Sequence, residues 1–166
     1  MKLKIMPSFL AILLLTAAAG VAFSLHAAVP QNNTQTVTYP SGDEAVSGYL
    51  AMPSGAGKHP AIIVIHEYWG LNDWVKEQAQ KFAAQGYVSL AIDLYRGKVA
   101  TTPEEAHELM RGVPDDRGLR DLEAAFTYLS NRPEVDAKKI GVVGWCMGGG
   151  YSIKLAVDQA KLAALS

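Results

Sequence analysis

The sequence predicts an α/β fold, a mostly parallel sheet with flanking helices. Residues 61–65 form a continuous apolar run of strand length, which is typical of a strand buried on both faces of a sheet. Residues 87–92 form a second such run, and the segment between the two has apolar residues at helical spacing. A third short apolar stretch, residues 140–143, leads directly into another helical pattern. This alternation of strands and helices indicates parallel pairing.

The chain begins with the pattern of a secretory signal peptide, predicted over residues 1–28. Lys2 and Lys4 precede an apolar run at 9–19, and small residues follow, with cleavage plausible after Ser24, Ala27 or Ala28. The run is shorter than the roughly 20 residues of a membrane span, although an uncleaved anchor is the alternative. We therefore expect a periplasmic or secreted domain over residues 29–166, with no membrane association after cleavage.

The first half of that domain is predicted to hold four strands and one helix. Alternating polarity bounded by turn residues indicates the first two strands, and a loop rich in Gly and Pro follows them. Asp73 is the predicted cap of the helix, and Gly86 ends it. The predicted strands are residues 36–39, 46–52, 61–65 and 87–92, and the predicted helix is 73–85.

The second half is predicted to hold three helices and one strand. Thr102 followed by Pro103 and two acidic residues is a strong helix start, and that helix ends near Gly112. A loop with Pro114 and Gly118 precedes the next helix. The predicted helices are residues 102–112, 119–129 and 147–162, and the predicted strand is 140–143.

The composition excludes several classes of protein. With 166 residues, a net charge of −1 and 49% hydrophobic residues, the chain is typical of one globular domain rather than a disordered protein. The absence of a basic stripe argues against a nucleic-acid partner. No cofactor or metal is predicted, because His66-Glu67 begins like a zinc motif but position 70 is Gly.

The segment Gly144-Trp-Cys146-Met-Gly148 matches the G-x-S-x-G nucleophile elbow, with Cys in place of Ser. Glycines allow the sharp strand-to-helix turn that pushes one side chain out above the sheet. A thiol there lies at a helix N-terminus, which favours the thiolate. A phosphate loop is excluded because Tyr151 follows Gly150 where Lys is required.

Cys146 is the single cysteine of the chain, so it cannot form an intrachain disulfide. It is predicted to be a reactive thiol, with a buried structural cysteine as the alternative. A thiol redox function is disfavoured because there is no resolving cysteine.

Four segments give the chain a resemblance to the dienelactone hydrolase family of α/β-hydrolases, which use Cys at the elbow. They are residues 66–72, 93–95, 121–125 and 141–149. The resemblance implies a hydrolase in which Cys146 attacks the carbonyl of a small lactone or ester. It also implies that the backbone N–H groups of Tyr68 and Met147 form the oxyanion hole, and that Glu67 influences the protonation of the thiol.

We further expect the strand at 61–65 to lie between the strands at 87–92 and 140–143. Glu67 and Cys146 would then emerge side by side at the carboxyl ends of neighbouring strands, where ligands bind in open α/β sheets. His66 is interpreted as a site-lining or core residue. The arginines that bind substrate in the family are not matched, although Arg96, Arg111 and Arg117 occur in the same broad region.

The sequence departs from the family's order of nucleophile, acid and histidine. After Cys146 the only acid is Asp158, and there is no His. The chain is therefore expected to be a fragment without the C-terminal strands, in which 140–143 is a sheet edge and the thiol acylates without turnover. The alternative function is that of a truncated or degenerate relative that at most binds a small carbonyl ligand.

Overall fold

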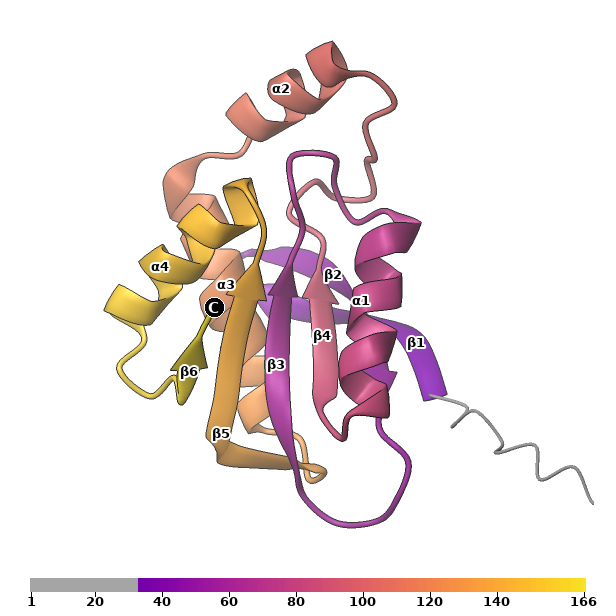
Figure 1. The fold of residues 1–166 in the computed structure, drawn as a ribbon. Coiled ribbons are helices and arrows are strands. Elements are labelled where there is room, and N and C mark those ends of the chain that lie inside the picture. Colours follow the sequence, from indigo (N-terminus) through magenta and orange to yellow (C-terminus); the bar gives the residue numbers. More distant parts are fainter. Residues whose placement is uncertain (1–32) are drawn as a thin grey trace, which may run out of the picture.

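The computed structural model describes residues 33–166, so the predicted signal peptide at 1–28 lies outside the described residues. A six-stranded sheet in the order β1-β2-β4-β3-β5-β6 is flanked by helices (Figure 1). The α/β prediction is therefore confirmed. The strands are β1 (Asn33–Ser41), β2 (Glu44–Met52), β3 (His59–Ile65), β4 (Val88–Ile92), β5 (Val135–Gly144) and β6 (Ala164–Leu165); the helices are α1 (Asp73–Ala84), α2 (Pro103–Arg111), α3 (Asp115–Ser130) and α4 (Met147–Asp158).

The centre of the sheet is parallel. Strand β3 pairs in parallel with β4 on one side and β5 on the other, which confirms the predicted order. Every residue of β4 is buried, as its continuous apolar run indicates. The antiparallel hairpin of β1 and β2 completes one side of the sheet through pairing between β2 and β4.

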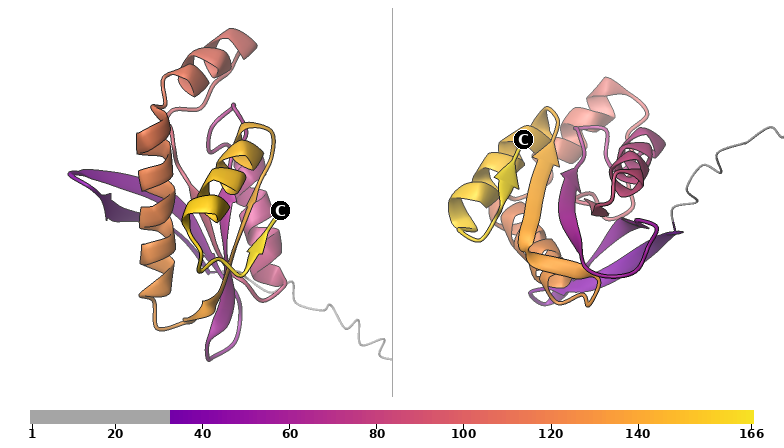
Figure 2. Two further views of the ribbon diagram at one scale, coloured as in Figure 1. Left: turned by 90° about the vertical axis from the view of Figure 1, so that its left-hand side faces the viewer. Right: turned by 60° about the horizontal axis from the view of Figure 1, so that its bottom comes forward.

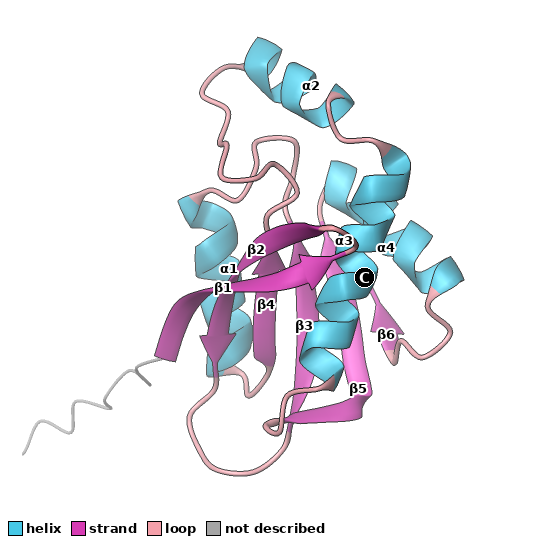
Figure 3. Cartoon of the chain, turned by 180° about the vertical axis from the view of Figure 1, so that it is seen from behind, coloured by secondary structure: helices cyan, strands magenta, loops and turns pink. Residues whose placement is uncertain are grey.

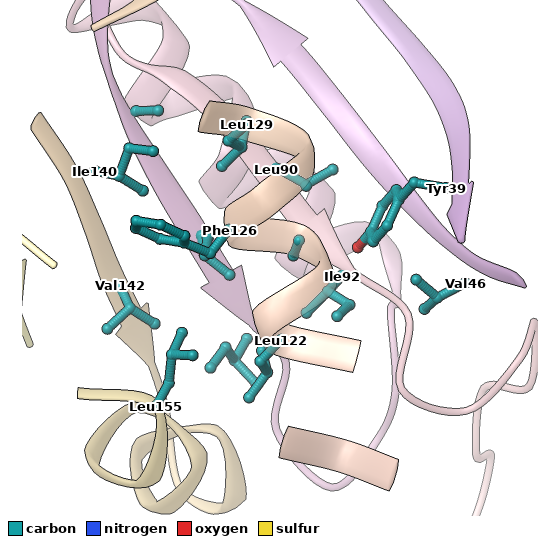
Figure 4. Close-up of a cluster of buried hydrophobic side chains, with 14 of the residues drawn as sticks. Tyr39, Val46, Leu90, Ile92, Leu122, Phe126, Leu129, Ile140, Val142 and Leu155 are labelled. Carbon is teal, nitrogen blue, oxygen red and sulfur yellow. The ribbon is translucent and has the colours of Figure 1, made fainter. Parts of the chain in front are cut away.

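Helices cover both faces of the sheet (Figures 1 and 2). Successive side chains of β3 point to opposite faces, so Ile63 and Ile65 pack with α3 and α4, whereas Val64 packs with α1. Figure 4 shows the larger cluster, in which Phe126 and Leu155 meet the sheet. Two apolar layers therefore fix the position of the strands whose ends carry the predicted site.

The prediction that residues 140–143 form a sheet edge is wrong for the described residues. Strand β6 pairs in parallel with β5, and the N–H of Ser166 donates to Val142 O at 3.0 Å. Helix α4 ends at Asp158 rather than at 162, which leaves enough chain to turn back along β5. The main-chain groups of β5 are thus partly covered.

Two helix starts also differ from the prediction. The cap of α1 is Asn72, whose side chain accepts from the N–H of Val75 at 3.1 Å, and Asp73 is the first helical residue. Helix α3 begins at Asp115 and includes Gly118, which was predicted to lie in a loop. A Cβ atom at Gly118 would lie 2.5 Å from the ring of Tyr151, so this glycine serves close helix packing.

The N-terminal hairpin is longer than predicted and lies beside α3 (Figure 3), where Tyr39 stacks on Tyr128. Strand β1 includes Pro40, which is tolerated because β1 is an edge strand. Helix α2 stands beyond the carboxyl ends of the central strands (Figures 1 and 2), with Ala106 as its one fully buried residue. Within residues 33–166, no helix has the length and apolar character of a membrane span.

Candidate active site

The turn between β5 and α4 has the geometry of a nucleophile elbow. Cys146 has φ 53° and ψ −115°, a conformation that L-residues rarely adopt, and its side chain is exposed. The N–H of Gly148 donates to Trp145 O at 2.8 Å, and that of Gly149 donates to Cys146 O at 3.1 Å. The thiol therefore projects from a tight turn at the start of α4.

Two glycines of the motif are required by close backbone packing. A Cβ atom at Gly144 would collide with the main chain of Gly148. A Cβ atom at Gly148 would lie 2.5 Å from Ile65 O, at the end of the neighbouring strand β3. By contrast, nothing lies within 4 Å of a Cβ atom at Gly150. The glycine spacing of the motif is thus explained by two close contacts, one between the elbow and β3 and one within the elbow.

The loop after β3 faces the elbow. Ile65 pairs with Gly144 in the sheet, so both segments leave the sheet at the same level. Within residues 33–166, no backbone hydrogen bond is donated by the N–H of Tyr68 or of Met147. These are the two N–H groups that the family resemblance assigns to the oxyanion hole.

Tyr95, just after β4, connects these two predicted residues. Its hydroxyl lies 3.1 Å from Tyr68 O and 3.3 Å from the sulfur of Met147. Burial, and after it the nearby Tyr151 and Cys146, raises the pKa of Tyr95 to about 12, so its hydroxyl stays protonated at neutral pH. The sequence pattern assigned no role to Tyr95, although this residue follows a strand end and closes the segment 93–95 that resembles the family.

His66 is a core residue rather than a site-lining one. It has no exposed surface, and burial lowers its pKa despite a hydrogen bond to Glu67 O and the nearby Asp93. Its Nδ1 lies 2.5 Å from Glu67 O, and the N–H of Leu94 donates to its Nε2 at 3.3 Å. Both ring nitrogens are thus occupied by the protein, which leaves His66 without a free nitrogen to act as a base.

Glu67 lies two residues beyond the paired end of β3, as Cys146 lies two residues beyond the paired end of β5. Its side chain is half-buried, and no hydrogen bond joins its carboxylate to the rest of the described chain. The predicted effect of Glu67 on the thiol remains a prediction.

The other histidines of the described chain also lack contact with Cys146. His59 begins β3, at the opposite end of the strand from the elbow. His107 lies on α2, where its ring contacts that of Tyr68 edge-on at 5.3 Å and its Nδ1 bonds Pro103 O at 2.7 Å. Among residues 33–166, no group of three or more His, Cys, Asp or Glu side chains could hold a metal ion.

The arginines near the site are mainly structural. Arg96 pairs with Asp121 at 2.7 Å and with Glu44 at 2.9 Å, so it ties the β4 turn to α3 and to the hairpin. Arg117 donates to Leu94 O at 3.2 Å. Arg111 lies exposed at the end of α2. A cleft of about 780 Å³ opens beside Tyr95 and is lined by both acidic and basic side chains; they are Arg96, Lys98, Glu105, Glu108 and Arg117.

Comparison with known proteins identifies the family. Residues 46–165 match the model of the dienelactone hydrolase family. The chain belongs to the dienelactone hydrolase family. Proteins similar to it include Protein usf of Aquifex pyrophilus, which is 36% identical over 129 residues that cover 74% of this chain and 54% of the relative. The carboxymethylenebutenolidase of Pseudomonas putida is 29% identical, over 76% of this chain and 59% of the enzyme.

A solved structure named m3DLH is 32% identical to this chain, with a TM-score of 0.72. The alignment covers 79% of this chain and 56% of that one. The chain thus spans somewhat more than half the length of the relatives it matches. These matches confirm the predicted family and fold.

Proposed function

We propose that this dienelactone hydrolase-family protein cleaves a small lactone or ester with Cys146 as the nucleophile. The observation that carries the proposal is the conformation of Cys146: an exposed thiol at φ 53°, at the N-terminus of α4. A strained non-glycine residue persists only where the surrounding structure enforces it, and such residues cluster at functional sites. Gly144 and Gly148 provide that enforcement here.

In the proposed reaction the Cys146 thiolate attacks the carbonyl carbon, and the carbonyl oxygen becomes an oxyanion. The N–H groups of Tyr68 and Met147 stabilise this oxyanion. The C–O bond to the leaving alcohol then breaks, the alkoxide takes up a proton, and a thioester remains on the sulfur. Attack by water on the thioester releases the acid and restores the thiol.

The proposed substrate class comes from the relatives. The Pseudomonas putida protein is named a carboxymethylenebutenolidase, which is a lactone hydrolase, and homologues with this activity support a lactone for the present chain.

The first test is acylation by p-nitrophenyl acetate. Mass spectrometry should detect one added acetyl group on the chain, on the tryptic peptide that contains Cys146, with release of one equivalent of nitrophenol. The Cys146→Ala variant should show neither. Acetylation elsewhere on the protein, or none at all on a folded wild type, would contradict the proposed nucleophile.

A second candidate, a non-catalytic relative that binds a small carbonyl ligand, is favoured by one observation. No histidine among residues 33–166 contacts Cys146, so these residues supply no imidazole to take up and return a proton. We therefore expect these residues to release one burst of nitrophenol from p-nitrophenyl acetate and then to hydrolyse the thioester only slowly. Ligand binding without any burst would favour the second candidate.

We also propose that the protein is exported, on the basis of the Lys-flanked apolar segment near its start. Expression of the full chain in a bacterial host should give a mature product in the periplasmic fraction. Its N-terminal sequence should begin after Ser24, Ala27 or Ala28. Recovery of the unprocessed chain in the cytoplasm would contradict this proposal.

A further inference from the structure

We propose that His66 and Tyr95 are positioning residues that hold the Tyr68 N–H in the direction required for the oxyanion hole. The inference rests on the proposed function and assigns to that site two side chains that act through the backbone. His66 has no exposed surface and so cannot touch a substrate.

The contribution of His66 follows from the planarity of the peptide bond. The Glu67 carbonyl and the Tyr68 N–H belong to the same rigid peptide unit, so the direction of one fixes that of the other. The Leu94 N–H donates to Nε2 of His66, which leaves the ring proton on Nδ1. Nδ1 then donates to Glu67 O at 2.5 Å, and the Gly70 N–H donates to the same oxygen at 3.2 Å.

Tyr95 fixes the next peptide unit and joins it to the elbow. A hydroxyl group has one proton, and the carbonyl oxygen of Tyr68 is a better acceptor than a thioether. The hydroxyl therefore donates to Tyr68 O at 3.1 Å, while the sulfur of Met147 lies in contact at 3.3 Å. The peptide units on both sides of Tyr68 are thus held by buried side chains.

The two side chains also support each other. Their ring centroids lie 4.7 Å apart at an angle of 65°, an edge-on packing. The backbone N–H of Tyr95 donates to the carboxylate of Asp93 at 3.0 Å, which fixes the turn that carries the ring. A further backbone bond, from Ala100 N–H to Trp69 O at 2.9 Å, joins the two loops.

This arrangement suits catalysis because donors that are already oriented stabilise a developing charge without reorganisation. His66 has no surface that a substrate could touch, and the Tyr95 hydroxyl is engaged with Tyr68 O, so both side chains would act through the backbone. We call the hydrogen bonds from His66 to Glu67 O and from Tyr95 to Tyr68 O the clamp. A positioning role predicts that losing either bond slows only reactions in which an oxyanion forms. A general structural role predicts that every reaction of the thiol changes.

The test therefore compares two reactions of the single thiol. Acylation by p-nitrophenyl acetate passes through an oxyanion, whereas alkylation by iodoacetamide does not. In the full chain, Tyr95→Phe removes the hydroxyl and keeps the ring. We expect its acylation rate to fall about tenfold, less than for outright loss of an oxyanion donor, with alkylation unchanged. Tyr128→Phe is the matched control. This residue of α3 accepts a hydrogen bond from Arg132 at 2.8 Å, and its loss should leave the acylation and alkylation rates unchanged.

A pair of variants at His66 tests the other half of the clamp. In His66→Asn the amide nitrogen takes the place of Nδ1 and can still donate to Glu67 O. In His66→Gln the longer side chain places its amide near Nε2 and loses that donor. We expect the acylation rate to fall more in the Gln variant than in the Asn variant, at equal alkylation rates. Thermal melting of each variant checks that it is folded.

The outcomes separate the inference from the function on which it rests. A wild type that is alkylated but not acylated would contradict the proposed function itself. A wild type that is acylated, with Tyr95→Phe and His66→Gln unchanged in both reactions, would contradict the clamp alone. A parallel loss of acylation and alkylation in folded variants would assign the residues a general structural role and would also overturn the inference. If Tyr95→Phe does not fold, the comparison of the two His66 variants decides.

Discussion

Two strand ends of this protein hold a non-glycine residue at positive φ, and they differ in what holds the strained residue. Arg96 follows β4 with φ 56°, and Cys146 follows β5 with φ 53°. The guanidinium of Arg96 is paired with Asp121 and Glu44, and the hydrogen bond that it donates to Asp121 is the largest cause that raises the pKa of Arg96. The side chain of Cys146 caps nothing and is exposed.

Such backbone strain costs on the order of 1–3 kcal/mol. At Arg96, the ion pairs of the residue itself offset that cost, so the turn anchors the hairpin to α3. At Cys146 the strain is held by its glycine neighbours and by the contact with β3. The comparison shows that the same backbone conformation serves attachment in one turn and presentation of a thiol in the other.

The largest expected effect on stability concerns the turn that holds Arg96. Asp121→Ala removes a fully buried carboxylate that also accepts from the Ser41 hydroxyl at 2.6 Å. Because the charge of Arg96 would lose its buried partner, we expect the free energy of unfolding to fall by about 3–5 kcal/mol. Urea denaturation measures this change. The control is Asp115→Ala, where an exposed pair with Lys154 should contribute less than about 1 kcal/mol. Equal losses would contradict the anchoring role.

The next effect concerns the turn that holds Cys146. In Gly148→Ala the new methyl group would meet Ile65 O and His66 O, so we expect a loss of about 1–3 kcal/mol in unfolding free energy and slower alkylation of Cys146. Gly150→Ala, two residues along the same helix, meets nothing and should stabilise the protein by about 0.5–1 kcal/mol. If both variants behaved alike, the close packing of the elbow would be refuted.

A smaller effect distinguishes the two strained residues directly. Cys146→Gly relieves the strain and removes few contacts, so we expect the unfolding free energy to rise by about 1 kcal/mol while all thiol labelling is lost. Arg96→Gly relieves similar strain but removes the ion pairs, so its unfolding free energy should fall by a similar amount. Changes of the same sign, measured by urea denaturation, would show that the two turns are held in the same way.

The smallest expected effect is a decrease in unfolding free energy as the pH falls below 7. His66 lies between the two turns, and burial lowers its pKa in the folded state. Its neutral form therefore contributes stability that is fully present above the unfolded pKa of about 6.5 and is lost as the pH falls toward the folded pKa. We expect unfolding free energy to decrease from pH 7 to pH 5, by no more than about 1.4 kcal/mol per pH unit from this group. In His66→Asn the decrease should be smaller; an identical slope would contradict the assignment.

Much of the fold could be predicted from local patterns. The buried strands β3 and β4, the capped helix α2 and their order in the sheet follow from apolar periodicity and from Thr102 with Pro103. The elbow could be predicted because its glycine spacing records a steric requirement. Boundaries set by tertiary contact could not, as Gly118 shows: it lies within α3 because the ring of Tyr151 requires close packing there.

The sequence by itself determined the α/β alternation, the family and the turn that presents Cys146, because periodicity and turn chemistry are local properties of the chain. Only the tertiary structure decided which side chains hold that turn and the facing loop in place. The bonds from Ser41 to Asp121 and from Tyr95 to Tyr68 join residues 80 and 27 positions apart. Such contacts depend on how the sheet and loops bring strand ends together, and no short motif encodes them. Backbone geometry after folding therefore gave His66 and Tyr95 the positioning roles proposed here.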